Sequence, residues 1–376
     1  MELDRRRFLA ATLASSLMPE MLQAAEAVTV PLYAAVAMQL RAESVEAAPD
    51  RAAARAAMLA QIDRVGAQIL QAKIFIEQYG GSPLKLAVLP EYLFTSYPGR
   101  IGIEAFADKA AIAEGGPEYT ALGALAQRLK LHLAGNAYET DTHFPGLYFQ
   151  TSFIIGPSGD VVLRYRRLNS MYAVTPHDLW DRYLDIYGLD GVFPVAVTEI
   201  GRLAAIASEE ILYPEIARAH ALRGAEVFVH CSSEIGSPML THKAIARRAR
   251  AFENLAYVVS ANTAGIGGTA MPLASADGNS ALIDWKGNVL AESNAGETFT
   301  AFADIDITGL RRARRKPGMT NYLSRQRLEL FAAAYAGSVQ PANTLIENGA
   351  VKTPDRDHFA RTQAAVIEKL AKAGII

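Results

Sequence analysis

The chain has 376 residues, of which 51% are hydrophobic and 20% are charged, and its formal net charge is −2. This composition is typical of a globular protein long enough to bury a large core, and it excludes a disordered chain. The balanced charge favours neither nucleic acid nor an anionic membrane as a partner. The single cysteine, Cys231, and seven scattered histidines exclude a disulfide within the chain and a clustered zinc site, so we expect no metal and no cofactor.

The first 27 residues have the layout of an export signal. A basic start precedes an apolar stretch too short to span a bilayer, and small residues follow around Ala25. Arg5 and Arg6 stand one residue before Phe8 and Leu9, which fits the twin-arginine pattern. We expect residues 1–27 to be a cleaved twin-arginine signal peptide and the mature protein to be periplasmic or secreted, without stable membrane association. The alternative is an amphipathic helix of the mature protein.

The mature chain begins with a predicted strand over Val28–Gln39 and a long helix over Ala52–Ile76, which carries apolar residues at helical spacing. Leu84–Leu89 predicts a buried strand that ends in Pro90-Glu91-Tyr92. A helix, a strand and a hairpin follow, over Tyr119–Leu129, Leu131–Ala134, and Ser152–Ile155 paired with Val161–Tyr165. We expect the aromatic and acidic stretch Asn169–Asp190 to be irregular.

Residues 201–234 predict a strand, a sharp turn, a helix and a second strand. Leu203–Ala207 is an apolar run that Ser208 interrupts. Pro214 is suited to a first helical turn, and Gly224 to a helix end. A polar residue at the end of such a strand is where open α/β sheets place their chemistry, although a solvated acidic turn would give the same pattern.

After Cys231 we expect a helix over His242–Leu255 and then strands over Tyr257–Ala261, Ser280–Asp284, Val289–Glu292 and Phe299–Ile305. The basic run 311–316 lacks interleaved aromatic residues, so we interpret it as a solvated helix face or an interface, not as a nucleic-acid site. The chain shows no internal repeat or linker. We therefore expect one domain, with a helical extension over residues 326–376.

Five segments, in this order, resemble the nitrilase or carbon–nitrogen hydrolase superfamily, and most closely its aliphatic amidases. They are LAVLPEY (86–92), GDVVLRYRRL (159–168), residues 201–234, RARAFENLAYVVSANTAG (248–265) and GNSALIDWKGNVLAE (278–292). The resemblance covers residues 28–325 and implies an α/β fold, a four-layer α-β-β-α sandwich. It also implies pairing of subunits through helices, as a homodimer or a higher even oligomer.

The resemblance implies a site built from a Glu general base, a Lys that stabilises the oxyanion and a Cys nucleophile. Glu91 matches the family Glu, whereas Arg167 stands at the Lys position and Ser208 at the Cys position. Three further residues are candidates for the pocket lining: Tyr92, Glu210 and Cys231.

The two substitutions argue against the usual mechanism. A serine hydroxyl is far less acidic than a thiol, whose pKa is about 8.5, and a carboxylate is a poor base for it. Arg167 keeps the positive charge, but its longer planar group does not fit the Lys geometry. Glu209 further disfavours negative charge at Ser208.

Other nucleophiles and bases are less well supported by the sequence. Cys231 could act as a substitute nucleophile, but a buried cysteine at a strand end is the better interpretation. His230 and His177 could act as bases, although nothing in the sequence places either beside Ser208.

We therefore predict an exported family protein with an altered Glu-Arg-Ser site. It is impaired or inactive in amide hydrolysis and binds a small-molecule amide, nitrile or carboxylate. Two alternatives stay open: an active amide hydrolase with Ser208 as nucleophile, and a structural or assembly protein that uses only the sandwich. The discriminating geometry is whether Glu91, Arg167 and Ser208 converge on an open pocket, or whether Arg167 fills it as a bidentate partner of Glu91.

Overall fold

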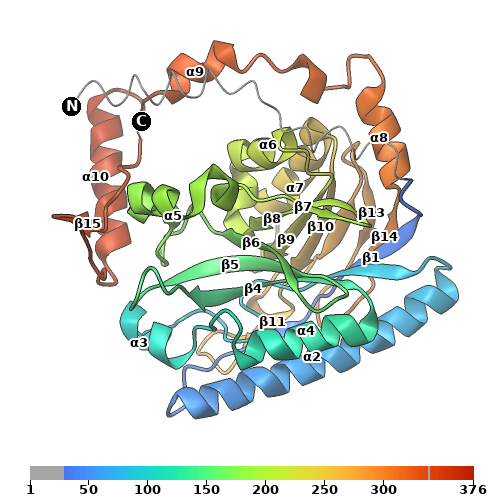
Figure 1. Cartoon of the computed structure of the whole chain (residues 1–376), viewed down its shortest axis with the longest axis horizontal. Coiled ribbons are helices and arrows are strands. Elements are labelled where there is room, and N and C mark those ends of the chain that lie inside the picture. The colour runs from blue at the N-terminus through green and yellow to red at the C-terminus, as the bar shows by residue number, and fades with distance from the viewer. Residues whose placement is uncertain (1–28, 338) are drawn as a thin grey trace.

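The computed structural model describes residues 29–337 and 339–376, in which two six-stranded sheets face each other (Figure 1). The first sheet has the strand order β14 (Phe302–Ile305), β1 (Tyr33–Ala37), β3 (Leu84–Val88), β4 (His132–Thr140), β5 (Tyr148–Ile155) and β6 (Val161–Arg166). The second has the order β13 (Val289–Glu292), β12 (Ala281–Ile283), β10 (Tyr257–Asn262), β9 (Val227–Ser232), β8 (Gly201–Ala207) and β7 (Ala196–Thr198).

Strand β8 shows why these strands are continuous apolar runs. Leu203, Ala205 and Ala207 lie in the core between the two sheets, whereas Ala204 and Ile206 lie in the core under the helices of the second sheet. Successive side chains of a strand point to opposite faces, so a strand covered on both sides needs apolar residues at every position. The resulting layers are helix, sheet, sheet and helix, as the resemblance implied.

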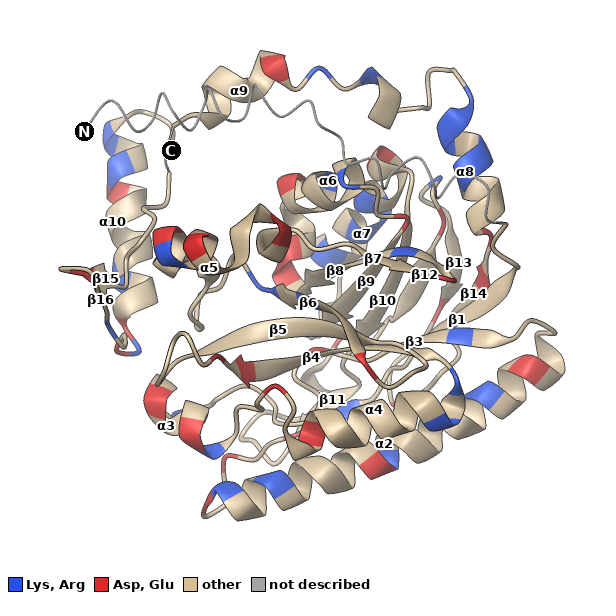
Figure 2. Cartoon of the chain, viewed as in Figure 1, with Lys and Arg blue, Asp and Glu red and all other residues tan. Residues whose placement is uncertain are grey.

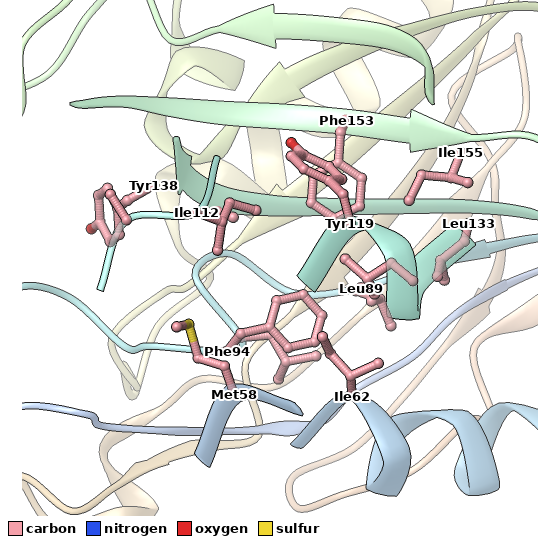
Figure 3. Close-up of a cluster of buried hydrophobic side chains, with 14 of the residues drawn as sticks. Met58, Ile62, Leu89, Phe94, Ile112, Tyr119, Leu133, Tyr138, Phe153 and Ile155 are labelled. Carbon is pink, nitrogen blue, oxygen red and sulfur yellow. The ribbon is translucent and has the colours of Figure 1, made fainter. Parts of the chain in front are cut away.

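Helices α2 (Arg51–Tyr79), α3 (Ile103–Lys109) and α4 (Pro117–Leu129) cover the first sheet. Met58 and Ile62 of α2 and Tyr119 of α4 pack over Leu133 and Phe153 of the sheet (Figure 3). Each fully buried apolar side chain of this kind stabilises the fold by about 1.5–3 kcal/mol.

Helices α6 (Pro214–Leu222) and α7 (His242–Asn254) cover the second sheet. As predicted, Pro214 occupies the first turn of α6, and Gly224 follows its end with a φ of +97°, a conformation that glycine adopts without strain. The strand–turn–helix–strand order predicted for residues 201–234 is therefore confirmed.

Some local predictions are wrong. Helix α5 (Trp180–Val192) lies in the stretch that we expected to be irregular; its non-helical Gly188 splits it into two pieces, which obscures the periodicity. Strand β1 begins at Tyr33 and strand β14 at Phe302, later than the predicted starts at Val28 and Phe299.

Short elements complete the chain: β2 (Arg41–Glu43) pairs with β11 (Gly265–Gly267), and 3-10 turns lie at Pro176–Leu179, Ser208–Leu212, Leu273–Ser275 and Leu323–Arg325.

The C-terminal extension carries two helices, in agreement with the predicted helical extension, and also a short hairpin. It contains α9 (Glu329–Tyr335), a hairpin of β15 (Ile346–Glu347) and β16 (Ala350–Val351), and α10 (His358–Lys372). It runs from α8 (Ile307–Arg315) past α6 to the side of α5 (Figure 1). Backbone hydrogen bonds from Asn343 to His177 and from Leu345 to Asp178 attach it there.

The basic run lies on α8 and its end, where Figure 2 colours the Lys and Arg positions blue. Arg311 forms an ion pair with Glu226 at 2.7 Å, and Arg314 donates to the carbonyls of Ala225 and Leu255. These contacts hold α8 against the second sheet. The predicted signal peptide lies outside the described residues, and among those described no helix is long and apolar enough to cross a membrane.

Candidate active site

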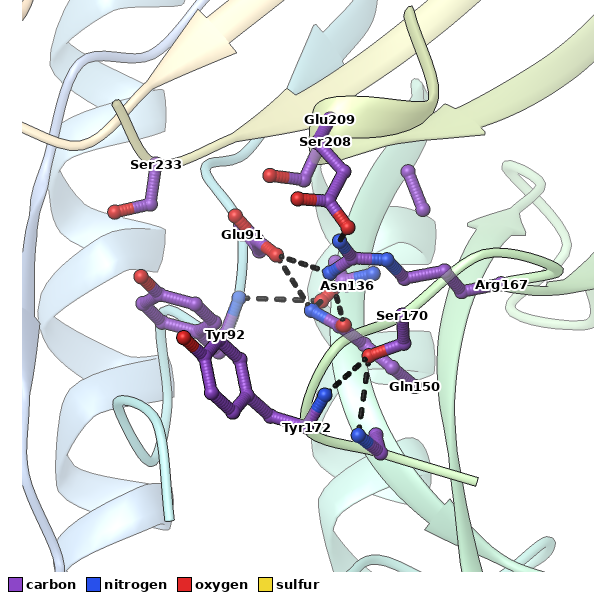
Figure 4. Close-up of polar contacts among 12 residues, drawn as sticks. Glu91, Tyr92, Asn136, Gln150, Arg167, Ser170, Tyr172, Ser208, Glu209 and Ser233 are labelled. Atoms are coloured by element: carbon purple, nitrogen blue, oxygen red, sulfur yellow. Dashed lines mark hydrogen bonds and ion pairs between the residues drawn. The ribbon is translucent and has the colours of Figure 1, made fainter. Parts of the chain in front are cut away.

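The three residues singled out by the sequence meet where strands of both sheets end. Glu91 follows β3, Arg167 follows β6 and Ser208 follows β8. The backbone N–H of Glu91 donates to the carbonyl of Ser232, the last residue of β9, at 3.3 Å, which joins the ends of the two sheets. All three side chains are nearly buried, with relative exposures of 3%, 8% and 4%. They converge, but at a buried position (Figure 4).

The Glu91 carboxylate is held from one side. Its Oε1 accepts hydrogen bonds from Gln150 Nε2 at 2.7 Å and from Arg167 Nη1 at 3.2 Å. Asn136 supports the same turn, because its Oδ1 accepts from the backbone N–H of Tyr92 and from Gln150. Both of the contacts to Glu91 fall on Oε1, so Oε2 points away from the guanidinium (Figure 4).

Arg167 bridges two carboxylates. Its Nη1 contacts Glu91 Oε1 at 3.2 Å and its Nη2 contacts Glu209 Oε1 at 2.5 Å. Nη1 also donates to Gln150 Oε1 at 2.7 Å, and Nε donates to the carbonyl of Asn169 at 2.6 Å. Burial opposes the charge, but Glu91 and Glu209 raise the pKa of Arg167 above its usual value. The guanidinium is thus shared between carboxylates and does not form a bidentate pair with Glu91.

Ser208 has a left-handed backbone, with a φ of +50°. Such a conformation in a residue other than glycine costs on the order of 1–3 kcal/mol and persists only where neighbours hold it. His230 Nε2 provides that hold at 2.8 Å from the carbonyl of Ser208, while its Nδ1 contacts Ser260 Oγ at 2.8 Å. The hydroxyl of Ser208 accepts a hydrogen bond from Lys243 Nζ at 3.1 Å.

Glu210 lies behind the site and supports its backbone. Its Oε1 accepts from the backbone N–H groups of Leu168 and Asn169, and its Oε2 accepts from the hydroxyl of Tyr165. The carboxyl is fully buried, and burial raises its pKa to about 7, against the opposing effects of Arg167 and these donors. Glu210 therefore fixes the segment that carries Arg167, and its contacts do not make it part of a pocket lining.

The other candidates divide between the site and the core. The Tyr92 ring lies beside Glu91, and burial raises its pKa (Figure 4). Cys231 is fully buried in the core between the sheets, where burial raises its pKa, so it lacks the thiolate that a nucleophile needs. His177 packs on Trp180, away from Ser208.

His230 should make the protein sensitive to acid. Burial lowers its pKa to about 3, and the same cause lowers that of the buried His220 to about 3. The unfolded chain takes up protons near pH 6.5 and the folded chain does not. The stability due to neutral His230 is thus complete above pH 6.5 and is lost as the pH falls toward 3, at up to about 1.4 kcal/mol per pH unit.

Between pH 6 and 4, we expect His230→Gln to reduce the slope of the unfolding free energy against pH by about 1.4 kcal/mol per pH unit, which corresponds to one proton. Urea unfolding at several pH values measures this slope. Glu210 acts in the opposite direction below pH 7, since its raised pKa lets the folded state hold a proton, and this contribution cancels in the comparison with wild type. Equal slopes in the two proteins would contradict the assignment.

Sequence reasoning missed several contacts in this site. Lys243 is distant from Ser208 in sequence and has no motif around it, so no pattern could have connected them. Gln150 and Asn136 carry a weak signal, since both are polar residues inside otherwise apolar strands. His230 does touch Ser208, but through the backbone carbonyl and not the hydroxyl.

Comparison with known proteins agrees with this architecture. The carbon–nitrogen hydrolase family model matches residues 33–315, and the chain therefore belongs to the carbon–nitrogen hydrolase family. A formamidase of Bacillus cereus is 29% identical over 210 residues, which is 56% of this chain and 59% of that protein. A formamidase of Bacillus anthracis is 27% identical over 209 residues, with the same coverage of 56% and 59%. The match thus spans less than two thirds of these formamidases.

Three solved structures share the fold. Nit3 of Saccharomyces cerevisiae, a member of branch 10 of the nitrilase superfamily, has a TM-score of 0.59 at 20% identity over 78% of this chain and 96% of its own. A carbon–nitrogen hydrolase from Helicobacter pylori has a TM-score of 0.58 at 19% identity, covering 81% and 98%. A cysteine-to-serine mutant of the Nesterenkonia AN1 amidase has a TM-score of 0.55 at 18% identity, covering 81% and 98%.

Proposed function

We propose that this protein binds a small amide or carboxylate at Glu91, Arg167 and Ser208 and hydrolyses amides at or near background. The observation that carries the proposal is the Arg167 guanidinium held between Glu91 and Glu209. In the family reaction, a separate cation must be available for the oxyanion that forms on the substrate. A guanidinium already shared between two carboxylates is poorly placed to serve that oxyanion.

The remaining geometry supports binding of a small ligand. Glu91 Oε2 points away from Arg167 and can accept an amide N–H, and Ser208 supplies a hydroxyl at the same group of strand ends (Figure 4). The near-complete burial of the three side chains favours a ligand whose reacting end is small. The formamidase relatives point in the same direction, toward a small amide.

The test is ammonia release from formamide, acetamide, propionamide and small nitriles by the purified mature protein. We expect rates near those of the Ser208→Ala variant, together with saturable binding of an amide or carboxylate by calorimetry. Robust amide turnover that disappears in Ser208→Ala would overturn the proposal and favour an active hydrolase with a serine nucleophile.

Export through the twin-arginine route is a further part of the proposal. The receptor for this route reads the guanidinium pair, so Arg5→Lys with Arg6→Lys should leave the full-length protein in the cytoplasm. Cell fractionation followed by intact mass measures both location and cleavage near residue 27. Unchanged export of the double variant would contradict the assignment.

We also propose an even assembly, starting from a homodimer. The C-terminal extension supports this, because Leu330, Phe331 and Tyr335 of α9 expose more than half of their surface. We expect light scattering to give twice the monomer mass at micromolar concentration. Phe331→Glu should reduce this measured mass. A monomer at that concentration would contradict the proposal.

A further inference from the structure

Ser208 contacts a cation that the family pattern does not contain. Lys243 lies in the first turn of α7, after Thr241, whose side chain caps the helix. Its Nζ lies 3.1 Å from Ser208 Oγ and donates a hydrogen bond to it. The lysine side chain is 14% exposed, so this contact is largely shielded from water.

Neighbouring groups hold the Lys243 ammonium in place. It donates to the carbonyl of Ser233 at 3.1 Å and to Ser232 Oγ at 3.5 Å, and Glu234 Oε2 lies at 3.5 Å. The groups other than Ser208 thus come from the end of β9 and the segment that follows it. A cation fixed by several partners is preorganised and does not have to be moved into position.

The two cations of the site therefore differ in their partners. Arg167 is bound to Glu91 and Glu209, whereas Lys243 reaches the hydroxyl oxygen of Ser208. Within the described residues 29–337 and 339–376, the cation that donates a hydrogen bond to Ser208 Oγ is Lys243. The positive charge that contacts the nucleophile position comes from α7 and not from the end of β6.

An ammonium group that donates to a serine oxygen changes the chemistry of that oxygen. It stabilises negative charge on Oγ, because an opposite charge within hydrogen-bond distance favours the ionised form. The serine oxygen can accept a hydrogen bond from Lys243 and donate its own hydrogen at the same time, so the hydroxyl proton stays available for transfer. Both effects favour attack by Ser208 on an electrophile.

We infer that Lys243 activates Ser208 as a nucleophile, and that the site accepts an acyl group from an activated ester although it hydrolyses amides poorly. Ser208 Oγ attacks the acyl carbon and forms a new C–O bond, and the bond to the aryloxy group breaks. The phenolate leaves with the electron pair, and the serine proton passes to water. Lys243 stays protonated and keeps its hydrogen bond to Oγ throughout.

The choice of an ester over an amide follows from the leaving group. A phenolate departs without a proton, whereas an amine must be protonated by a positioned acid. In the family this acid is the Glu at the position of Glu91; in this protein Gln150 and Arg167 hold one oxygen of that carboxylate, and an activated ester does not need the acid. The inference rests on the proposed function, in that it assigns a residual reaction to the same Ser208.

The experiment uses p-nitrophenyl acetate with the full mature chain, followed by absorbance of released p-nitrophenolate and by peptide mass spectrometry. We expect acetylation of Ser208 in the wild-type protein and none in Ser208→Ala. Lys243→Met should acetylate about 100-fold more slowly, the size of effect seen when one charge-stabilising donor is removed. Lys243→Gln keeps a donor without the charge and should also be slow. Thermal unfolding establishes that each variant is folded.

Rescue separates the charge from a structural role of the side chain. Lys243→Cys treated with 2-bromoethylamine gains an aminoethyl thioether that replaces the lysine, with loss of bromide. The native Cys231 is fully buried, and wild-type protein treated in parallel controls for its reaction. We expect treatment to restore most of the acetylation rate.

Three results would overturn the inference: no acetyl group on Ser208 in the wild type, wild-type rates in Lys243→Met or Lys243→Gln, or no rescue of Lys243→Cys. The proposed function fails through a different measurement, robust amide turnover that depends on Ser208. The ester and amide assays therefore distinguish the two failures.

Discussion

Ser208→Cys combined with Arg167→Lys is expected to give measurable hydrolysis of small aliphatic amides where the wild-type protein gives almost none. The two substitutions restore the Cys and Lys of the family around the retained Glu91. A cysteine at position 208 would lie next to the Lys243 ammonium, and an adjacent cation favours the reactive thiolate. A lysine at position 167 lacks the forked guanidinium that joins Glu91 to Glu209, so its charge is free to meet the oxyanion.

The expected gain follows from the oxyanion contact. Such contacts are worth about 2.7–4 kcal/mol, or roughly 100–1000-fold in rate. Ser208→Cys alone should give little, because Arg167 remains bound between its two carboxylates. Ammonia release from formamide and acetamide measures the rate, and intact mass detects a trapped thioester.

Glu91→Gln in the rebuilt protein provides the control. It removes the general base with almost no change in volume and should abolish turnover while leaving the thiol in place. If the rebuilt protein stays inactive with its fold intact, the site differs from its relatives at more than these two positions. Binding without chemistry then becomes the stronger account.

The sequence predicted most strands well because they are buried on both faces, whereas their arrangement as a sandwich was implied by the family resemblance. A strand such as Leu203–Ala207 needs apolar residues at every position, and the turn residues Pro214 and Gly224 set the limits of the next helix. Helix α5 escaped prediction because Gly188 interrupts it and because its aromatic residues serve a specific contact. Tyr183 and Tyr187 surround the Arg166 guanidinium, so they do not follow an apolar stripe.

The candidate site was predicted at the level of positions but not of contacts. Glu91, Arg167 and Ser208 were assigned from the family resemblance, and each of them follows the end of a strand. The pairing of Arg167 with Glu209, and of Ser208 with Lys243, depends on where separate loops bring their side chains. A sequence shows that charged residues are present near such a site, but not which carboxylate receives which cation.

Arg167→Met is expected to lower the free energy of unfolding by about 3–5 kcal/mol, the largest loss that we predict for a single substitution in this protein. The guanidinium and Glu91 are 8% and 3% exposed, so removal of the cation leaves a buried carboxylate without its charged partner. Methionine fills much of the same volume, which keeps the effect of a cavity small. The Glu209 side chain is 34% exposed, so water compensates for most of the ion pair that Glu209 loses when Arg167 is replaced.

A double-mutant cycle with Glu91→Gln isolates the pair. Removing both charges takes away the unpaired carboxylate, so Arg167→Met with Glu91→Gln should be more stable than Arg167→Met alone by about 1–3 kcal/mol. Urea unfolding of the four proteins, with unchanged m-values, gives the coupling energy. If the two single losses simply add, the Arg167–Glu91 contact contributes no coupling. The guanidinium would then be free to turn toward a substrate, and its engagement by carboxylates could not be the reason for weak amide hydrolysis.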